Sequence, residues 1–316
     1  MRRASVVRPI QPQTLTQNFR RRLRRFKDPL GIAYQLRTLP NLEAEYREGI
    51  YKSHESSNQL EEYALSHDGL PFTKSWHYFG FYDQHLGRIA RASREGSDDK
   101  PLKILEIGVW QGGSLQLWRR YFGNSATIFG IDVDPRCLDL DGLSACVRIG
   151  SQVDGDFLRD VMAEMGGVDI VIDDGSHNCS HVIKSFEALF PLLGDGGFYF
   201  VEDLHTSYWP QWRGGLRRPG TSIEFFKDLV DVVNSDSFRR APLRGDKSDL
   251  AREARSVEFV DSMVLVRKGK RERARILYGG VHEPGYLASW GALGADWRGR
   301  GGAYAGPSGH EVEVQD

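Results

Sequence analysis

Two short apolar runs in the middle of the chain each end in a pair of acids, and this repeat constrains the fold most strongly. The run at 170–172 is followed by Asp-Asp-Gly-Ser-His (173–177), and the run at 198–201 is followed by Glu-Asp (202–203). An apolar run that stops at polar, flexible residues is typical of a buried strand. If the two strands are parallel neighbours, their acids meet at the carboxyl edge of the sheet, where open α/β sheets bind ligands.

Strand and helix patterns alternate from residue 101 onward. Apolar strand patterns are expected at 103–109, 127–134, 146–150, 168–172 and 198–201, with helices between them at 114–121, 157–165 and 181–193. Two further strands are expected at 257–260 and 262–266. This alternation predicts right-handed βαβ units and an α/β fold with a doubly wound, mostly parallel, seven-stranded sheet.

The chain divides into three parts by composition. Residues 1–95 are expected to form a helical N-terminal extension or lid, 96–268 the α/β domain, and 269–316 a glycine-rich, loosely ordered tail. The aromatic-rich stretch at 71–82 can cover a ligand pocket or fill the core. The arginine-rich run at 19–27 is interpreted as a solvated or partly disordered arm, with contact to an anionic partner or to a membrane surface as the alternative.

The composition excludes several classes of protein. The chain has 316 residues, is 40% hydrophobic and has a net charge of −1, so it offers no overall field for nucleic acid. No apolar run approaches the length of a membrane span, and no secretory signal is evident. Three scattered cysteines predict neither a disulfide framework nor a zinc cluster. We expect a reduced, cytoplasmic protein that binds neither nucleic acid nor membrane; a homo-oligomer is left open.

The turn after the first strand, at 106–113, reads Glu-Ile-Gly-Val-Trp-Gln-Gly-Gly. Its glycines allow a ligand to approach the backbone closely. A dinucleotide fingerprint requires glycine where this chain has Trp110, which disfavours a pyrophosphate and hence a nicotinamide oxidoreductase. An acid at the strand end also suits a cationic ligand better than a phosphate.

Acids at two neighbouring strand ends favour S-adenosylmethionine as the ligand. Glu106 suits its amino-acid end, and Asp132 and Asp134 can accept hydrogen bonds from ribose hydroxyls. The alternative is a tight turn with surface acids. The residues expected to bind this cofactor are Glu106, Gly108, Gly112, Ser114, Asp132 and Asp173.

Three stretches, at 106–114, 173–177 and 201–208, resemble the class I methyltransferases of the macrocin and mycinamicin type, which O-methylate sugars on natural products. The resemblance covers roughly 101–266. It implies a Rossmann-like methyltransferase sheet, S-adenosylmethionine and Mg²⁺ as cofactors, and a small-molecule glycoside as the acceptor. The expected place of such an enzyme is antibiotic biosynthesis.

The resemblance also implies residue roles. By that match, Asp174, Glu202 and Asp203 hold magnesium, and His177 is the general base. The residue types agree, because magnesium prefers carboxylate oxygens and leaves positions open for vicinal hydroxyls. A neutral imidazole near a metal ligand can then take the hydroxyl proton. Asp173 is expected to help orient the metal ligands without contacting the metal itself, although a role as a metal ligand stays open.

Other interpretations remain for these residues. The acids at 173–174 can cap the following helix, and those at 202–203 can be a solvated strand end. His181 and His205 are expected to be structural or to line the pocket. The competing functions are a catechol or phenol O-methyltransferase, an enzyme that modifies cephalosporins, and a catalytically inactive methyltransferase-like binding protein. Two acid pairs, each with a nearby histidine, favour an active site.

Overall fold

The fold was taken from a computed structural model, which describes residues 56–97, 100–235 and 253–270. These described residues belong to one compact unit. The arginine-rich run at 19–27 and the tail from residue 271 lie outside the described residues. The boundaries predicted at residues 95 and 268 stay predictions.

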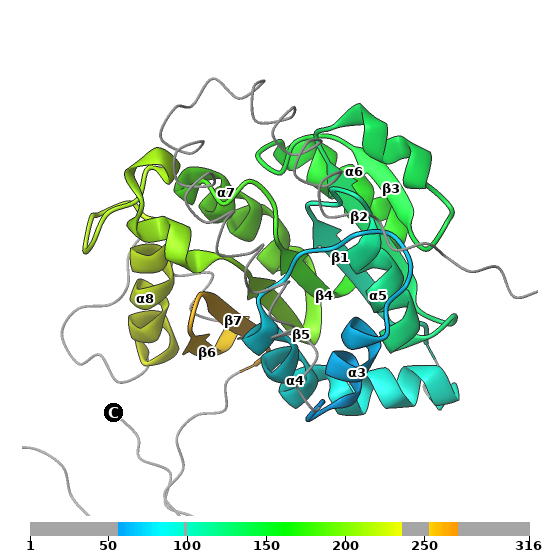
Figure 1. The fold of residues 1–316 in the computed structure, drawn as a ribbon. Helices are drawn as coiled ribbons and strands as arrows, with labels where there is room; N and C mark the ends of the chain where they lie inside the picture. Colours follow the sequence, from blue (N-terminus) through cyan, green and yellow to red (C-terminus); the bar gives the residue numbers. More distant parts are fainter. Residues whose placement is uncertain (1–55, 98–99, 236–252, 271–316) are drawn as a thin grey trace, which may run out of the picture. The chain divides into compact units, whose positions relative to one another are not determined.

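A seven-stranded sheet forms the centre of the described fold (Figure 1), with the strand order β3-β2-β1-β4-β5-β7-β6. Strands β1 to β5 pair parallel with one another, and β7 pairs antiparallel with both β5 and β6. The strands are β1 (Lys103–Ile107), β2 (Thr127–Asp132), β3 (Cys146–Ile149), β4 (Val168–Asp173), β5 (Leu193–Val201), β6 (Ala254–Val260) and β7 (Met263–Lys268). The predicted α/β class, with its mostly parallel seven-stranded sheet, is confirmed.

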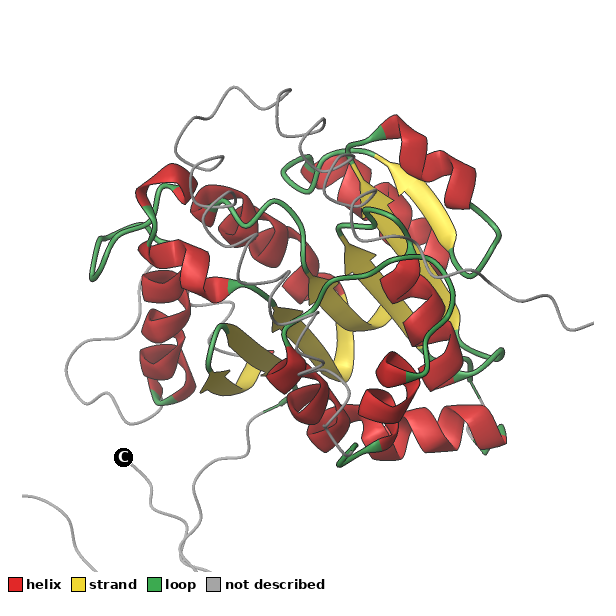
Figure 2. Ribbon diagram, in the orientation of Figure 1, coloured by secondary structure: helices red, strands yellow, loops and turns green. Residues whose placement is uncertain are grey.

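Helices cover both faces of this sheet (Figure 2). The main helices are α3 (Gln59–Leu65), α4 (Trp76–Glu95), α5 (Gly113–Phe122), α6 (Gly155–Met165), α7 (Cys179–Leu189) and α8 (Ser222–Val233). Leu105 of β1 packs with apolar residues of α6, α7 and α8, whereas its neighbour Ile104 packs with those of α3, α4 and α5. Successive side chains of a strand point to opposite faces, so a strand buried on both faces is apolar throughout.

Several element boundaries differ from the sequence prediction by a few residues, among them the starts of α7 and β5. Helix α7 begins at Cys179 because Asn178 caps it, accepting a hydrogen bond from the Ser180 backbone N–H. Strand β5 begins at Leu193, which pairs with Val168 before the register between β4 and β5 shifts. Glycines at 194, 196 and 197 make this strand start look like a turn in the sequence.

The aromatic stretch at 71–82 includes the first turns of α4 and fills part of the core, as one of the two predictions had it; that it covers a ligand pocket stays a prediction. Phe79 and Phe81 are buried in the core, whereas the hydroxyls of Tyr78 and Tyr82 reach acids at the sheet edge. The helix ends at Glu95 and is followed by Gly96, which has a left-handed backbone conformation. None of the helices in the part of the chain that the structure describes could cross a bilayer.

Candidate active site at the carboxyl edge of the sheet

The two acid pairs lie side by side, as the sequence predicted. Asp173, at the end of β4, is paired with Val201 at the end of β5. The residues that follow these strands, Asp174 and Glu202, therefore leave the sheet at the same edge. Gly108 follows β1 at this edge with φ 97°, and an added Cβ there would lie 2.2 Å from the Asp174 carbonyl oxygen. The turn after β1 thus packs directly against the backbone of Asp174.

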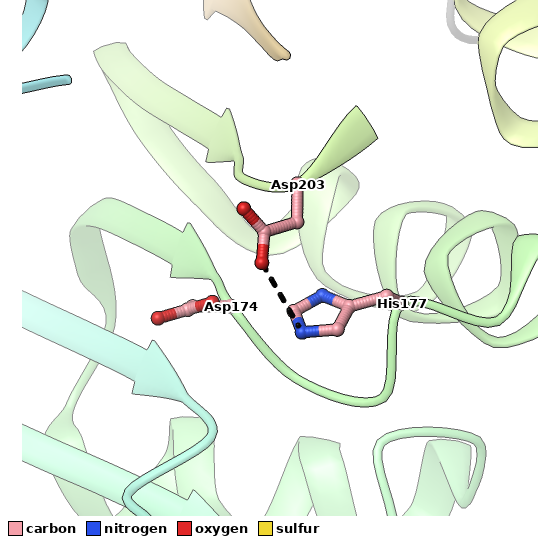
Figure 3. A group of neighbouring side chains, drawn as sticks. All are labelled: Asp174, His177 and Asp203. Carbon is pink, nitrogen blue, oxygen red and sulfur yellow. Dashed lines mark ion pairs between the residues drawn. The ribbon is translucent and has the colours of Figure 1, made fainter. Parts of the chain in front are cut away.

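Asp174, His177 and Asp203 form a compact group whose ligand atoms all lie within 4.8 Å of one another. Figure 3 shows the three side chains converging from the ends of β4 and β5. Nε2 of His177 lies 3.5 Å from Oδ2 of Asp203. Tyr78 fixes the other oxygen of Asp203, because its hydroxyl donates to Oδ1 over 2.8 Å. Oxygen and imidazole donors at this spacing can hold a divalent cation.

Lys74, which the sequence analysis did not single out, lies within the acid cluster. Its Nζ is 2.6 Å from Oε1 of Glu202, 2.9 Å from Oδ2 of Asp174 and 3.5 Å from Oε1 of Glu106, and its side chain is fully buried. The available signal was a single lysine among the aromatic residues at 71–82. A buried lysine requires paired charges, and three acids supply them.

The electrostatics of Asp174 and Glu202 reflect this lysine. Burial and the neighbouring Glu202 carboxylate raise the pKa of Asp174 well above its usual value, and the Lys74 ammonium opposes that rise. Glu202 is buried and accepts a second hydrogen bond, 2.6 Å long, from the Tyr82 hydroxyl. The predicted magnesium ligand Glu202 therefore has two partners within the protein.

Glu106 and Ser114, both predicted to bind the cofactor, bind each other. Ser114 Oγ donates to one carboxylate oxygen of Glu106 over 2.8 Å, and Trp118 Nε1 donates to the other over 3.0 Å. Glu106 is completely buried, which raises the pKa of its carboxyl, while the Lys74 ammonium lowers it. Glu106 thus links β1 to α5 through these two buried hydrogen bonds.

The predicted ribose acceptor Asp132 lies at the adjacent strand end and shapes the turn after β1. Its Oδ2 accepts hydrogen bonds of 3.0 Å from the backbone N–H groups of Val109 and Trp110. Gly112, which closes that turn, has φ 82°. Trp110, in this turn, and Val133, which follows Asp132, are 47% and 67% exposed. This edge therefore combines a carboxylate with exposed apolar surface.

Asp173 points to the side of the sheet opposite to Asp174 and is buried among polar partners. It accepts hydrogen bonds from Ser185, Gln152 and Tyr199. Burial raises its pKa to about 6, and the hydrogen bond from Ser185 opposes this. Gln152 also accepts a hydrogen bond from the Ser176 backbone N–H, 2.8 Å long, so Asp173 supports the turn that carries His177. Asn178, and neither acid, caps α7.

The remaining histidines border the cluster. His181 Nδ1 lies 2.9 Å from Ser176 Oγ, and burial together with the Arg213 charge lowers the pKa of this histidine. The ring of His205 packs against Trp209. Trp212 packs edge-on against His177, with ring centroids 5.9 Å apart. Aromatic rings therefore flank the side of the cluster at which His177 lies.

Comparisons with known proteins agree with this geometry. Residues 105–204 match a family described as "Methyltransferase domain". The chain is 35% identical to 8-demethyl-8-(2-methoxy-alpha-L-rhamnosyl)-tetracenomycin-C 3'-O-methyltransferase of Streptomyces olivaceus, over 67% of this chain and 54% of the relative. It is 33% identical to mycinamicin VI 2''-O-methyltransferase of Micromonospora griseorubida, over 65% and 52%. The chain spans about half the length of these curated relatives.

Solved structures show the same fold. A structure of the MycE methyltransferase from the mycinamycin biosynthetic pathway, in complex with Mg, SAH and mycinamycin VI, aligns with a TM-score of 0.59 at 28% identity. The alignment covers 84% of this chain and 68% of that one. A second MycE structure, in complex with Mg and SAH, gives the same TM-score over 74% of this chain and 61% of that one. This chain therefore contains a methyltransferase domain and resembles the sugar O-methyltransferases of natural-product biosynthesis.

Proposed function

We propose that this protein transfers a methyl group from S-adenosylmethionine to a sugar hydroxyl of a glycosylated small molecule, with the help of Mg²⁺. The observation that carries the proposal is the convergence of Asp174, His177 and Asp203 within 4.8 Å at the carboxyl edge of a methyltransferase sheet. The relatives named above act on sugars of natural products, and the aligned MycE structures hold Mg and SAH.

The edge formed by β1 and β2 fits S-adenosylmethionine. An adenosine group presents an apolar ring and two ribose hydroxyls, and this edge offers exposed Trp110 and Val133 beside the Asp132 carboxylate. Gly108 and Gly112 have positive φ angles and shape the turn that the cofactor would approach. Because Glu106 is fully buried, its part in cofactor binding would be to fix α5 through Ser114.

The acid cluster fits a hard divalent cation. Asp174 and Asp203 offer carboxylate oxygens from two strand ends, and their side chains are 19% and 32% exposed, so water or substrate can reach them. Magnesium is held in proteins by one or two carboxylates together with water and substrate oxygens. When bound there, it makes a hydroxyl that contacts it more acidic.

Residues of the chain would then accept the proton that leaves the acceptor hydroxyl. The His177 imidazole, half-buried and held beside Asp203, accepts the proton of the acceptor hydroxyl as general base. The new carbon–oxygen bond forms as the carbon–sulfur bond of the methyl donor breaks, which leaves S-adenosylhomocysteine. Asp203 would orient the imidazole and stabilise the imidazolium that results.

A catechol or phenol acceptor is the second candidate. Vicinal aromatic hydroxyls require the same metal and base, and Trp212 packs against His177 where a flat ring could stack. A catalytically inactive binding protein is the third, and it gives no reason for imidazole and two carboxylates to converge.

The test is mass spectrometry of candidate acceptors after incubation with the full chain, S-adenosylmethionine and Mg²⁺. The panel contains mycinamicin VI and rhamnosylated tetracenomycin C as glycosides and 3,4-dihydroxybenzoate as a catechol, chosen as probes. Methylation of a glycoside sugar is the expected result. Methylation of the catechol alone would favour the second candidate, and cofactor binding without methylation of any acceptor would favour the third.

A further inference from the structure

Two tyrosines of α4 donate hydrogen bonds to the two acids that follow β5. The Tyr78 hydroxyl donates to Oδ1 of Asp203 over 2.8 Å, and the Tyr82 hydroxyl donates to Oε1 of Glu202 over 2.6 Å. Residues four positions apart in a helix lie on the same face, so one face of α4 supplies both donors. Two consecutive acids are therefore held by the same helix, with one hydroxyl for each carboxylate.

Tyr78 contacts both the side chain and the backbone of Asp203. Its hydroxyl donates to Oδ1, and the same hydroxyl oxygen accepts a hydrogen bond from the Asp203 backbone N–H over 3.3 Å. The carbonyl of Ser262, a second acceptor near this hydroxyl, is farther away, at 3.4 Å. Asp203 has φ 52°, a conformation that few non-glycine residues adopt. One tyrosine hydroxyl therefore fixes the carboxylate and the unusual backbone of the same residue.

The start of α4 is fixed by packing, which sets where the two hydroxyls lie. The ring of Tyr82 lies 4.8 Å from that of Phe200 in β5 and 5.1 Å from that of Trp118 in α5, centroid to centroid. Nε2 of His77 lies 2.9 Å from the carbonyl oxygen of Asp261, in the turn between β6 and β7. Contacts that do not involve the acids thus place the tyrosines beside them.

Each tyrosine contacts one oxygen of its acid and leaves the second oxygen for another partner. Oδ2 of Asp203 lies 3.5 Å from Nε2 of His177, and Figure 3 shows the opposite oxygen turned away from that histidine. Oε1 of Glu202 is shared by Tyr82 and Lys74, whereas Oε2 has no hydrogen-bond or ion-pair partner among the described residues. Because one carbon joins the two oxygens of a carboxylate, holding the first oxygen also directs the second.

We propose that Tyr78 and Tyr82 are positioning residues, which orient Asp203 and Glu202 so that the second oxygen of each faces the divalent cation of the proposed function. The inference rests on that proposed function, in which acids at this edge of the sheet hold the metal. Loss of a group that hydrogen-bonds to a metal ligand costs about 10–100-fold in metal affinity. Tyr78 has the larger effect, because Glu202 keeps Lys74 when Tyr82 is replaced.

The test is Mn²⁺ binding to the full chain, measured by electron paramagnetic resonance, because Mn²⁺ takes the same oxygen ligands as Mg²⁺. This measurement requires neither acceptor nor cofactor. The variants are Tyr78→Phe and Tyr82→Phe, which remove one hydroxyl each and keep the packing of the ring. Tyr121→Phe is the matched control, since Tyr121 is also buried and donates over 2.7 Å to Asp83, an acid outside the site.

The three variants should separate by metal affinity and not by stability. Tyr78→Phe should weaken Mn²⁺ binding about 10–100-fold. Tyr82→Phe should weaken it by a smaller factor, and Tyr121→Phe should leave it unchanged. The thermal midpoint should fall in all three, because each variant loses one hydrogen bond of a buried tyrosine.

The other outcomes distinguish the inference from the proposed function. Equal Mn²⁺ affinities in Tyr78→Phe and Tyr121→Phe would overturn the positioning role while keeping the metal. A loss confined to Tyr78→Phe would remove Tyr82 from the assignment. Failure of the unaltered protein to bind Mn²⁺ would overturn the metal role in the proposed function, and the inference with it. If Tyr78→Phe does not fold, the comparison of Tyr82→Phe with Tyr121→Phe decides alone.

Discussion

Nε2 of His177 lies 3.5 Å from Oδ2 of Asp203, and both residues have a left-handed backbone, with φ 55° and 52°. Few non-glycine residues adopt this conformation, although Asp and His do so more often than most, and such residues cluster at functional sites. The two strained residues turn their side chains toward each other from different strand ends (Figure 3). This pairing is the basis of the proposed proton transfer.

Replacing His177 tests that transfer. His177→Asn should lower the rate of methyl transfer by about 10²–10⁴-fold, because a positioned base contributes about that much. Asparagine tolerates the left-handed backbone of this position better than alanine does. Cofactor affinity, measured by calorimetry, should stay near normal. His205→Ala should cost less, and a large loss there with near-normal turnover in His177→Asn would reassign the base.

The cofactor edge is tested at Asp132. Asp132→Asn should weaken binding of S-adenosylhomocysteine about tenfold or more, because a hydrogen bond to a charged acceptor contributes about 1.5–3 kcal/mol. Asp139→Asn removes the same charge from the nearby 3₁₀ helix Pro135–Leu140 and is the control. Calorimetric affinities that are equal in the two variants would argue against a cofactor role for Asp132.

Gly108 should be essential for packing at the site. Gly108→Ala places a Cβ against the Asp174 backbone at a positive φ, so strain of about 1–2 kcal/mol adds to an overpacking cost of about 1–3 kcal/mol. Gly142→Ala is the matched control, because Gly142 has φ 76° with nothing within 4 Å of an added Cβ. Thermal denaturation should give the lower midpoint for Gly108→Ala. Equal midpoints would contradict the close approach of the two turns.

Cys137 should be an unreactive thiol. Burial, followed by the charge of Asp132, raises its pKa to about 12, so little thiolate forms near neutral pH. In a Cys146→Ser/Cys179→Ser protein, maleimide labelling of Cys137 should be slow. Its rate should rise about tenfold per pH unit through about pH 10, because each unit below the pKa cuts the thiolate tenfold. A rate that levels off near about pH 9 would contradict this environment.

The strand ends were predictable because their signals are local. An apolar run followed by acids fixes both the strand and the place of the acids at one edge, so Asp174 and Asp203 could be predicted to lie close together. The direction of Asp173 follows from the same logic. Successive side chains of a strand point to opposite faces, so Asp173 had to face α7 if Asp174 faced the site.

Lys74 could not be predicted from such signals. Its partners Asp174 and Glu202 are 100 and 128 positions away, and no pattern within the aromatic stretch at 71–82 indicates which face the lysine takes. The burial of Glu106 depends on Trp118 and Ser114 in α5, whose contact requires the packing of a helix against the sheet. The positions of Lys74 and Glu106 therefore depend on long-range packing, which local sequence patterns do not reveal.

Methyl transfer with and without the metal tests the central claim most directly. The unaltered protein is treated with a chelator and assayed with methyl-labelled S-adenosylmethionine and the best acceptor of the glycoside screen, before and after Mg²⁺ is added back. The account predicts that transfer is lost in the chelator and returns with Mg²⁺, and that Mg²⁺ does not restore it in Asp203→Asn. Full transfer in excess chelator, with or without the Asp203 carboxylate, would contradict the account.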